Sequence, residues 1–350
     1  MKKFVALIIC AVLVFSFAAC DNKISDKNNT AITTTATVTD ATTTTTEVPV
    51  TTTSLVTTTE ESVTPEDKKI TPLLYKVTDD DNNVTWLFGS IHIGKEYFYP
   101  LPDYVIDAYE SSDALAVEAD MVSFASDFTA QTTALSKLVY TDSTTIKDHL
   151  PKETYDKAVE ILEEMGVYNS LLDYYMPFMW SSMIESGMTE QAGLDANLGI
   201  DMHFLNDAHE NNKEIIEVES AEFQYNMMAS FSAELQCIIL EEAIYSYEHP
   251  VTTKVGFKSL LHLWESGDED ALYKYLNTET EFESDEEETL YNEYNNEMIT
   301  NRNISMTDFA EDALKSGKEV FICVGAAHVV GEGGMAGQLK DRGYNVEIVR

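Results

Sequence analysis

The sequence predicts an α/β fold with a central mixed, largely parallel sheet, flanking helices and a long helical insertion or cap. Three observations support this fold class. Short apolar runs typical of buried strands recur along the chain, long helical stretches separate them, and polar residues follow the ends of several of these runs. Strands that alternate with helices are typical of sheets in which neighbouring strands are parallel.

Residues 1–19 have the pattern of a secretory signal peptide. Their apolar run, Phe4–Val14, follows two lysines and is shorter than the roughly 20 residues of a membrane-spanning helix. The segment Phe17–Cys20 is similar to a bacterial lipobox, although Phe17 stands where an aliphatic residue is usual. We therefore expect export and lipidation of Cys20, which would anchor the protein to the membrane on its extracytoplasmic face. Ordinary signal cleavage and an uncleaved anchor stay open as alternatives.

Residues 20–66 contain few large apolar groups and are dominated by threonine, with runs such as Thr42–Thr46. Such a composition cannot bury enough apolar surface to offset the loss of chain entropy, so we expect a disordered linker after the lipidated cysteine. Residues 67–350 have enough apolar content for one large domain.

The formal net charge of −39 argues against nucleic acid or anionic lipid as a direct partner, because both would be repelled. Many of the acidic residues lie in 266–297, including the run Asp285–Glu288. A solvated helix face is the ordinary interpretation; a calcium site is an alternative, although the spacing of an EF-hand is absent. In the predicted domain, Cys237 and Cys323 lie far apart, and we expect Cys323 to be a buried free thiol within a strand.

The first expected strand is Val84–Phe88, which follows a turn at Asp79–Asn83. Further strands are expected at Ala114–Asp120, Glu214–Glu219, Glu319–Val324 and Tyr344–Val349. Helices are expected at Asp103–Glu110, over Phe124–His209 with breaks near Pro151, Gly166 and Pro177, over Ala221–Leu314, and at Met335–Asp341 with Gly343 as its cap. The long middle helices are expected to form the insertion or cap.

The motif G-x-x-H occurs twice, each time at the end of an expected strand: Gly89–His92 and Gly325–His328. In open α/β sheets, ligands bind beyond the carboxyl ends of the strands. Two glutamates, Glu118 and Glu219, also lie at such ends. If the strands are parallel, the two histidines and two glutamates converge on one edge of the sheet.

Structural roles are also open for these residues. A histidine after a strand can simply be hydrogen-bonded, and Glu219 can stabilise the start of the following helix. Glu118 interrupts an apolar strand, where a carboxylate is costly without a cationic or metal partner.

The chain from about Leu73 to Arg350 resembles the TraB/GumN family, which is related to the Tiki metalloproteases. The resemblance rests on the order and spacing of short motifs at Leu87–His92, Tyr99–Pro102, Val117–Asp120, Gly199–Asp201, Lys213–Ser220, Arg302–Asn303, Val324–His328 and Gly343–Val346. It implies a fold similar to erythromycin esterase-like and ChaN-like haem-binding proteins. For Tiki relatives it implies a divalent-metal peptidase that depends on both G-x-x-H histidines and a glutamate, which correspond to His92, His328 and Glu118.

Two imidazoles and one carboxylate suit manganese, cobalt, iron or zinc, with positions left for water. We expect His92 and His328 to be metal ligands and Glu118 to be the third ligand or the general base, with Glu219 in the remaining role. Arg302 is expected to bind a substrate carboxylate or an oxyanion, or else to form a salt bridge with one of the acids.

The sequence also supports predictions for three further residues. Asp201 either orients a histidine or caps the helix Met202–His209. His203 and His209 are six residues apart on that helix, do not share one face, and are expected at the surface.

The sequence thus predicts a membrane-anchored, extracytoplasmic metal-dependent hydrolase, and a peptidase in particular. Its substrate would be a peptide or a small molecule. Hydrolysis of a small ester or lactone is a second possibility for an enzyme. Two classes without hydrolytic activity also stay open, namely a haem- or metal-binding surface lipoprotein and an adhesin.

Overall fold

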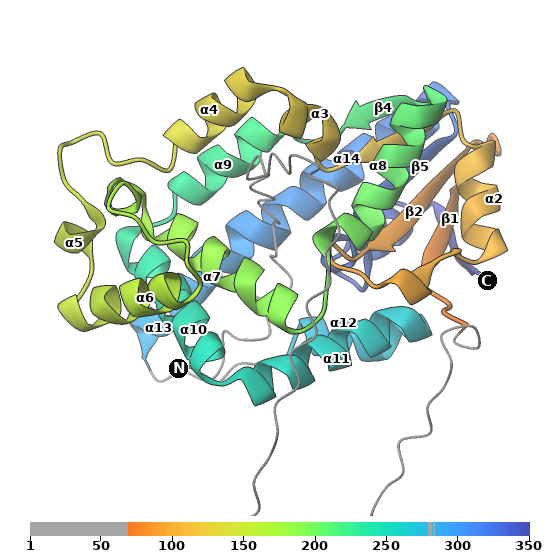
Figure 1. Cartoon of the computed structure of the whole chain (residues 1–350). Helices are drawn as coiled ribbons and strands as arrows, with labels where there is room; N and C mark the ends of the chain where they lie inside the picture. Colours follow the sequence, from red (N-terminus) through yellow and green to blue (C-terminus); the bar gives the residue numbers. More distant parts are fainter. Residues whose placement is uncertain (1–68, 279–281, 283) are drawn as a thin grey trace, which may run out of the picture. The chain divides into compact units, whose positions relative to one another are not determined.

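A mixed sheet of six strands forms the centre of the computed structural model, which describes residues 69–278, 282 and 284–350 (Figure 1). The strands are β1 (Leu74–Thr78), β2 (Val84–Ser90), β3 (Ala114–Val117), β4 (Glu214–Glu217), β5 (Val320–Gly325) and β6 (Asn345–Val349), in the spatial order β4-β3-β5-β2-β1-β6. Neighbours among β4, β3, β5 and β2 are parallel, whereas β1 is antiparallel to both β2 and β6. The predicted α/β class with a largely parallel sheet is confirmed.

The strand β1 was not expected from the sequence. Its residues form a hairpin with β2, in which Thr78 pairs with Val84 across the turn at Asp79–Asn83. The side chain of Asp79 accepts hydrogen bonds from the backbone N–H groups of Asp81 and Asn83, which stabilises this turn. The apolar run before a recognised turn was therefore an available signal for a strand.

The middle of the sheet is buried on both faces. All residues of β3 and β5 are buried, as expected for parallel strands that are covered by helices on both sides. Cys323 in β5 is a buried free thiol, as predicted, and Cys237 is free and half-buried. By contrast β4, at one edge, has exposed glutamates at both ends.

Helices make up most of the remaining described chain. They are α2 (Asp103–Ser111), α3 (Met121–Ser126), α4 (Phe128–Ser136), α5 (Ile146–His149), α6 (Lys152–Glu164), α7 (Pro177–Gln191), α8 (Ile200–Asn211), α9 (Ala221–Ala229), α10 (Ala233–Glu248), α11 (Pro250–Ser266), α12 (Glu269–Leu276), α13 (Asp285–Asn295), α14 (Asn301–Ser316), α15 (Ala326–Val329) and α16 (Met335–Asp341). The predicted breaks occur: Pro151 precedes α6, Gly166 adopts a left-handed φ of 73° after it, and Pro177 begins α7.

The helices α4 to α7, α9, α10 and α13 lie to one side of the sheet, and α14 extends from this group towards it (Figure 1). Between α13 and α14 the chain forms one π-helical turn, Asn296–Thr300, without leaving the helix. The acidic run Asp285–Glu288 forms the first turn of α13, where carboxylates interact favourably with the helix dipole.

The predictions for the start of the chain concern residues that the structure does not describe. The expected signal peptide, the lipidated Cys20 and the threonine-rich linker all lie outside the described residues. Within the described part of the chain, no helix has both the length and the apolar character needed to cross a membrane.

Candidate functional site

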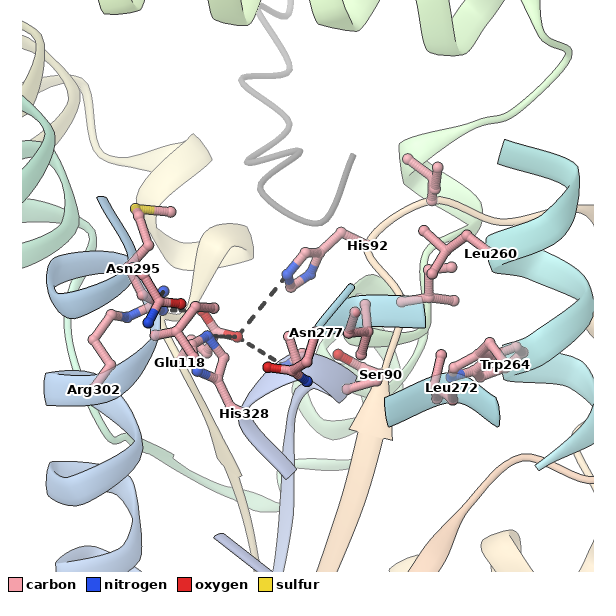
Figure 2. A pocket seen from close by; sticks show the side chains of 18 of the residues that line it. Ser90, His92, Glu118, Leu260, Trp264, Leu272, Asn277, Asn295, Arg302 and His328 are labelled. Carbon is pink, nitrogen blue, oxygen red and sulfur yellow. Dashed lines mark hydrogen bonds and ion pairs between the residues drawn. The ribbon is translucent and has the colours of Figure 1, made fainter. Parts of the chain in front are cut away.

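Four chemically reactive side chains come from four neighbouring parallel strands at one edge of the sheet. In the order of the strands they are Glu219 after β4, Glu118 after β3, His328 after β5 and His92 after β2. The Nε2 atoms of His92 and His328 each lie 3.9 Å from the same oxygen, Oε1 of Glu118 (Figure 2). The structure therefore brings together all four residues that the sequence places at the strand ends.

His92 is held by a carboxylate on its far side. Its Nδ1 lies 2.8 Å from Oδ2 of Asp201, and the other oxygen of Asp201 accepts a hydrogen bond of 2.6 Å from Ser90. Burial alone would lower the pKa of His92, but the charges of Asp201 and Glu118 outweigh burial and raise this pKa to about 9. Because a carboxylate can only accept, Nδ1 carries a proton in both the neutral and the charged ring, and Nε2 faces Glu118.

The start of α8 is attached to the loop that carries His92. The backbone N–H of Ile200 donates to the carbonyl of Ile91 at 3.0 Å, and Gly94 pairs with Asp195 as an isolated bridge. A Cβ on Gly94 would lie 1.8 Å from the carbonyl oxygen of Leu198, so only glycine allows this approach. The contact explains how Asp201, in the first turn of α8, reaches the imidazole.

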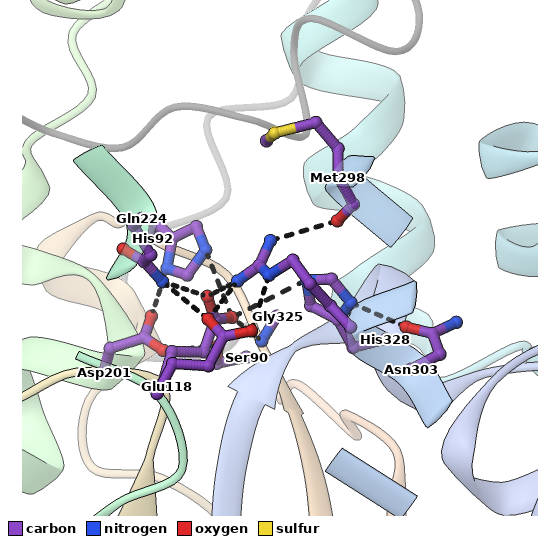
Figure 3. A network of polar contacts seen from close by, with 11 residues as sticks. Ser90, His92, Glu118, Asp201, Gln224, Met298, Asn303, Gly325 and His328 are labelled. Atoms are coloured by element: carbon purple, nitrogen blue, oxygen red, sulfur yellow. Dashed lines mark hydrogen bonds and ion pairs between the residues drawn. The ribbon is translucent and has the colours of Figure 1, made fainter. Parts of the chain in front are cut away.

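His328 is held by an amide instead. Its Nδ1 lies 2.7 Å from Oδ1 of Asn303 (Figure 3). Nδ2 of Asn303 donates to the carbonyl of Gly333 at 2.8 Å. His328 lies in the short helix α15, and its imidazole is almost fully buried. Burial and the nearby Arg302 guanidinium together lower the pKa of His328 to about 3, although Glu118 opposes them. This histidine is therefore neutral at physiological pH.

Arg302 connects the two glutamates. Its guanidinium donates to Oε2 of Glu118, to both oxygens of Glu219, and to the carbonyl of Met298 (Figure 3). Gln224 donates to the same two carboxylates at 3.2 and 3.1 Å. Burial would raise the pKa of Glu118, but Arg302 and the two histidines hold it well below its usual range. Of the roles expected for Arg302, the salt bridge is the one that the structure contains.

Gly325 leaves a space between the two histidines and Glu118. A Cβ added there would lie 3.3 Å from Oε1 of Glu118, 3.4 Å from Nε2 of His92 and 3.6 Å from Cδ2 of His328. The φ of Gly325 is −50°, which any residue can adopt. Its lack of a side chain therefore matters because of the space at the centre of the site, and not because of the backbone.

The π-helical turn before α14 places Arg302 and Asn303 at the site. Buried side chains recur every fourth residue at Leu290, Tyr294, Met298 and Arg302. Four residues exceed one turn of an α-helix, so such a stripe would drift around a regular helix. The wider π turn offsets part of this drift, and π turns are frequent at functional sites.

The side chains of this centre form part of the wall of a pocket, and the rest of the wall is mostly apolar (Figure 2). Its apolar side chains include Leu260, Trp264, Leu272, Leu276, Met298 and Ile299. The amide side chains of Asn277 and Asn295 also line it. No local pattern in the sequence indicates this wall, because it is assembled from the separate helices α11, α12 and α13 and from the π turn.

The remaining predicted residues lie elsewhere. His203 is half-buried, with its ring 4.5 Å from the ring of Tyr99, so the expectation of a surface position was wrong for it. His209 is exposed, as expected, and its Nε2 lies 2.9 Å from Asp120.

The residues at the centre are of the right kind for a metal ion, but they are spaced widely. Among the described residues, no group of three or more His, Cys, Asp or Glu side chains already has the arrangement of a metal site. Ligands of one tetrahedral zinc ion are roughly 3.3 Å apart, whereas each Nε2 lies 3.9 Å from Oε1 of Glu118. The side chains would have to close by about half an ångström around an ion.

The similarity of the chain to known proteins extends over nearly all of the described part. Residues 73–348 match the model of the TraB/PrgY/gumN family. Over 152 residues the chain is 28% identical to the uncharacterized protein YbaP of Shigella flexneri, and equally to that of Escherichia coli strain K12. This match covers 43% of the chain and 54% of each relative, so the chain spans about half the length of the curated relatives it matches. No solved structure matches the chain significantly.

Proposed function

The chain belongs to the TraB/PrgY/gumN family, and from this premise we propose that it is a metal-dependent hydrolase that cleaves peptides. One observation carries the proposal. Each G-x-x-H histidine is hydrogen-bonded through Nδ1 and turns Nε2 towards the same oxygen of Glu118. Histidine ligands of catalytic metals are typically fixed in this way, by an acceptor on the opposite ring nitrogen.

The charges around the site also favour a cation. The site contains three carboxylates and one guanidinium: Glu118 and Glu219 pair with Arg302, and Asp201 lies behind His92. With both histidines neutral, these groups carry a net charge of two negative units, which a divalent cation would neutralise. The raised pKa of His92 has the same origin, because in the metal-free protein a proton partly compensates this charge.

His92, His328 and Glu118 are the residues that would hold the ion. When bound, manganese, cobalt, iron or zinc polarises a substrate carbonyl and lowers the pKa of a bound water. Arg302 keeps Glu118 ionised, which suits a ligand better than a general base. Glu219 shares the same guanidinium and helps to hold Arg302 in place.

The apolar wall supports an organic substrate that is bound next to the reacting group. Side chains such as Leu260, Leu272 and Met298 offer a surface for an apolar side chain of a peptide. Asn277 and Asn295 offer amide groups that can hydrogen-bond a peptide backbone. A peptide offers partners both for the apolar side chains and for the amide groups of the wall.

A second candidate function is the hydrolysis of a small ester or lactone with His92 as general base. The contact between His92 and Asp201 favours it, because a carboxylate that orients an imidazole and raises its pKa is the arrangement of a general base. Metal dependence separates the two candidates.

Export and a lipid anchor at Cys20 complete the proposal, and they rest on the signal-like N-terminal sequence. In that location the threonine-rich residues 20–66 would connect the hydrolase domain to the membrane. Labelling of the expressed chain with a radioactive fatty acid, compared with Cys20→Ala, tests the anchor. Incorporation that is unchanged in the variant would contradict it.

Cleavage of a peptide library by the full chain tests the function. Reactions contain added Mn²⁺ or Co²⁺ or a chelator, and compare wild type with His92→Ala and His328→Ala. His209→Ala is the matched control, because His209 also contacts a carboxylate but lies outside the site. Cleavage that needs the metal and both histidines supports the proposal. Cleavage of esters that persists with chelator supports the second candidate, and binding of metal or haem without any hydrolysis would indicate a binding protein.

A further inference from the structure

We infer that Asn303 is a positioning residue, which selects the Nδ1–H tautomer of His328 and thereby keeps its Nε2 unprotonated and directed at Glu118. The sequence motif Arg302–Asn303 contributes to the family resemblance, but it assigns no role to the amide. The inference deepens the proposed function and rests on it where metal affinity is concerned, whereas the tautomer itself can be measured without a metal.

The hydrogen bonds of Asn303 determine which way its amide points. Its Nδ2 donates to the carbonyl of Gly333 at 2.8 Å, so its Oδ1 is the atom directed at Nδ1 of His328, at 2.7 Å. An amide oxygen can only accept, so the imidazole must carry its proton on Nδ1. Both side chains are almost fully buried, with 3% and 5% of their residue surface exposed, so water does not compete for either atom.

The helix α14 supports both sides of the site through two consecutive residues. Arg302 contacts the carboxylates that follow β3 and β4, while Asn303 contacts the histidine that follows β5. Consecutive residues of a helix point in directions about 100° apart, which matches this division. Asn303 is therefore placed by the same π turn that places Arg302.

An amide suits this position better than a carboxylate for an electrostatic reason. His92 already has Asp201 behind it, and the site also contains Glu118 and Glu219, which both pair with Arg302. A further buried carboxylate behind His328 would add negative charge without a partner. Asn303 supplies the required acceptor and adds no charge.

The test uses the full chain and three variants, Asn303→Leu, Asn303→Asp and Thr307→Val. Leucine removes the acceptor at similar size, and aspartate restores an acceptor. Thr307 is a matched control, because it is equally buried and lies one turn further along α14, where its hydroxyl donates to the backbone carbonyl of Asn303 and not to His328. Nitrogen-15 NMR of the imidazole rings measures the tautomer without metal, and calorimetry measures the affinity for Co²⁺.

We expect wild type, Asn303→Asp and Thr307→Val to have His328 as the Nδ1–H tautomer, and Asn303→Leu to populate the Nε2–H form. Loss of a partner behind a metal-bound histidine typically weakens metal affinity about 10–100-fold, so Asn303→Leu should weaken Co²⁺ binding by that factor. Asn303→Asp should stay within about tenfold of wild type.

An unchanged tautomer in Asn303→Leu would overturn the inference, as would an equal change in Thr307→Val. If wild type binds no Co²⁺ while Asn303→Leu still changes the tautomer, the positioning role stands and the proposed metal-dependent function fails. The two failures are therefore distinguishable.

Discussion

The two G-x-x-H turns share a spacing but not an environment. After Gly89 the chain bends, and the side chain of His92 stays 24% exposed with a carboxylate behind it. After Gly325 the chain forms the short helix α15, and the side chain of His328 is only 6% exposed with an amide behind it. Yet both Nε2 atoms are equally far from one oxygen of Glu118.

The difference shows which property each part of the chain controls. The neighbouring parallel strands β2 and β5 fix where the imidazoles meet, because Ser90 pairs with Gly325 in the sheet. The helices α8 and α14 determine the hydrogen-bond partner and the electrostatic environment of each imidazole, through Asp201 and Asn303. The local spacing of the G-x-x-H turns therefore sets where the two imidazoles meet. Residues far away in the sequence set the protonation of each ring.

The largest effect is expected from removing either imidazole. His92→Ala and His328→Ala should each weaken metal binding and metal-dependent peptide cleavage more than about 100-fold, because loss of a direct ligand costs more than loss of an outer partner. Calorimetry with Co²⁺ and the peptide-library assay measure the two effects. If one variant retained full affinity, the two turns would not serve a common ion.

The two glycines of the motif should behave differently. Gly325→Ala fills the space between the imidazoles and Glu118, so we expect at least about tenfold weaker metal binding with little loss of stability. At Gly89 a Cβ would lie 3.1 Å from the backbone of Ala326, so Gly89→Ala should destabilise the fold by about 1–3 kcal/mol. Chemical denaturation and calorimetry separate the effects, and equal behaviour of both variants would contradict this distinction.

Stability of the chelator-treated protein should depend on pH with opposite signs for the two histidines. The pKa of His92, about 9, is above its ordinary 6.5, so its stabilisation is complete below about pH 6.5 and is lost as the pH rises through 9. The pKa of His328, about 3, is below 6.5, so stability is lost as the pH falls from 6.5 towards 3.

At about 1.36 kcal/mol per pKa unit, these differences correspond to upper limits of roughly 3–5 kcal/mol. His92→Gln should therefore flatten the alkaline side of the stability profile, and His328→Gln the acidic side. Urea unfolding between about pH 4 and about pH 10 checks both variants. A profile that flattens on the same side in both would show that the environments are alike.

The smallest effect is expected for the histidine–carboxylate pair outside the site. His209 contacts Asp120 as His92 contacts Asp201, but His209 is exposed. His209→Ala should change stability by less than about 1 kcal/mol and leave metal affinity unchanged. Thermal unfolding and calorimetry measure this, and a large effect would place a second functional pair at the end of α8.

Much of this fold follows from features that are local in the sequence. The strands from β2 onwards are short apolar runs between turn residues, and the chemically active residues at their ends follow from the rule for parallel sheets. The strand β1 is harder to predict because its side chains are not strictly alternating in polarity: Leu74 and Tyr75 are both buried between β2 and β6.

The partners at the site are less accessible to sequence reasoning. Asp201 is a predictable partner for a histidine, but its distance from His92 along the chain leaves the contact open. Asn303 and Gln224 contact residues more than 20 and 100 positions away, respectively, and no local pattern identifies such pairs. The motif Arg302–Asn303 draws attention to this residue but does not identify the partner of its amide.

The position of β5 in the sheet has a consequence for the timing of assembly. It lies between β3 and β2, but its residues, Val320–Gly325, come long after those of both strands in the sequence. Until β5 pairs with β3 and β2, the strands that precede Glu118 and His92 are not joined by a shared neighbouring strand. A chain in which β5 has not yet paired therefore cannot form the proposed metal site, because His328 is not in place.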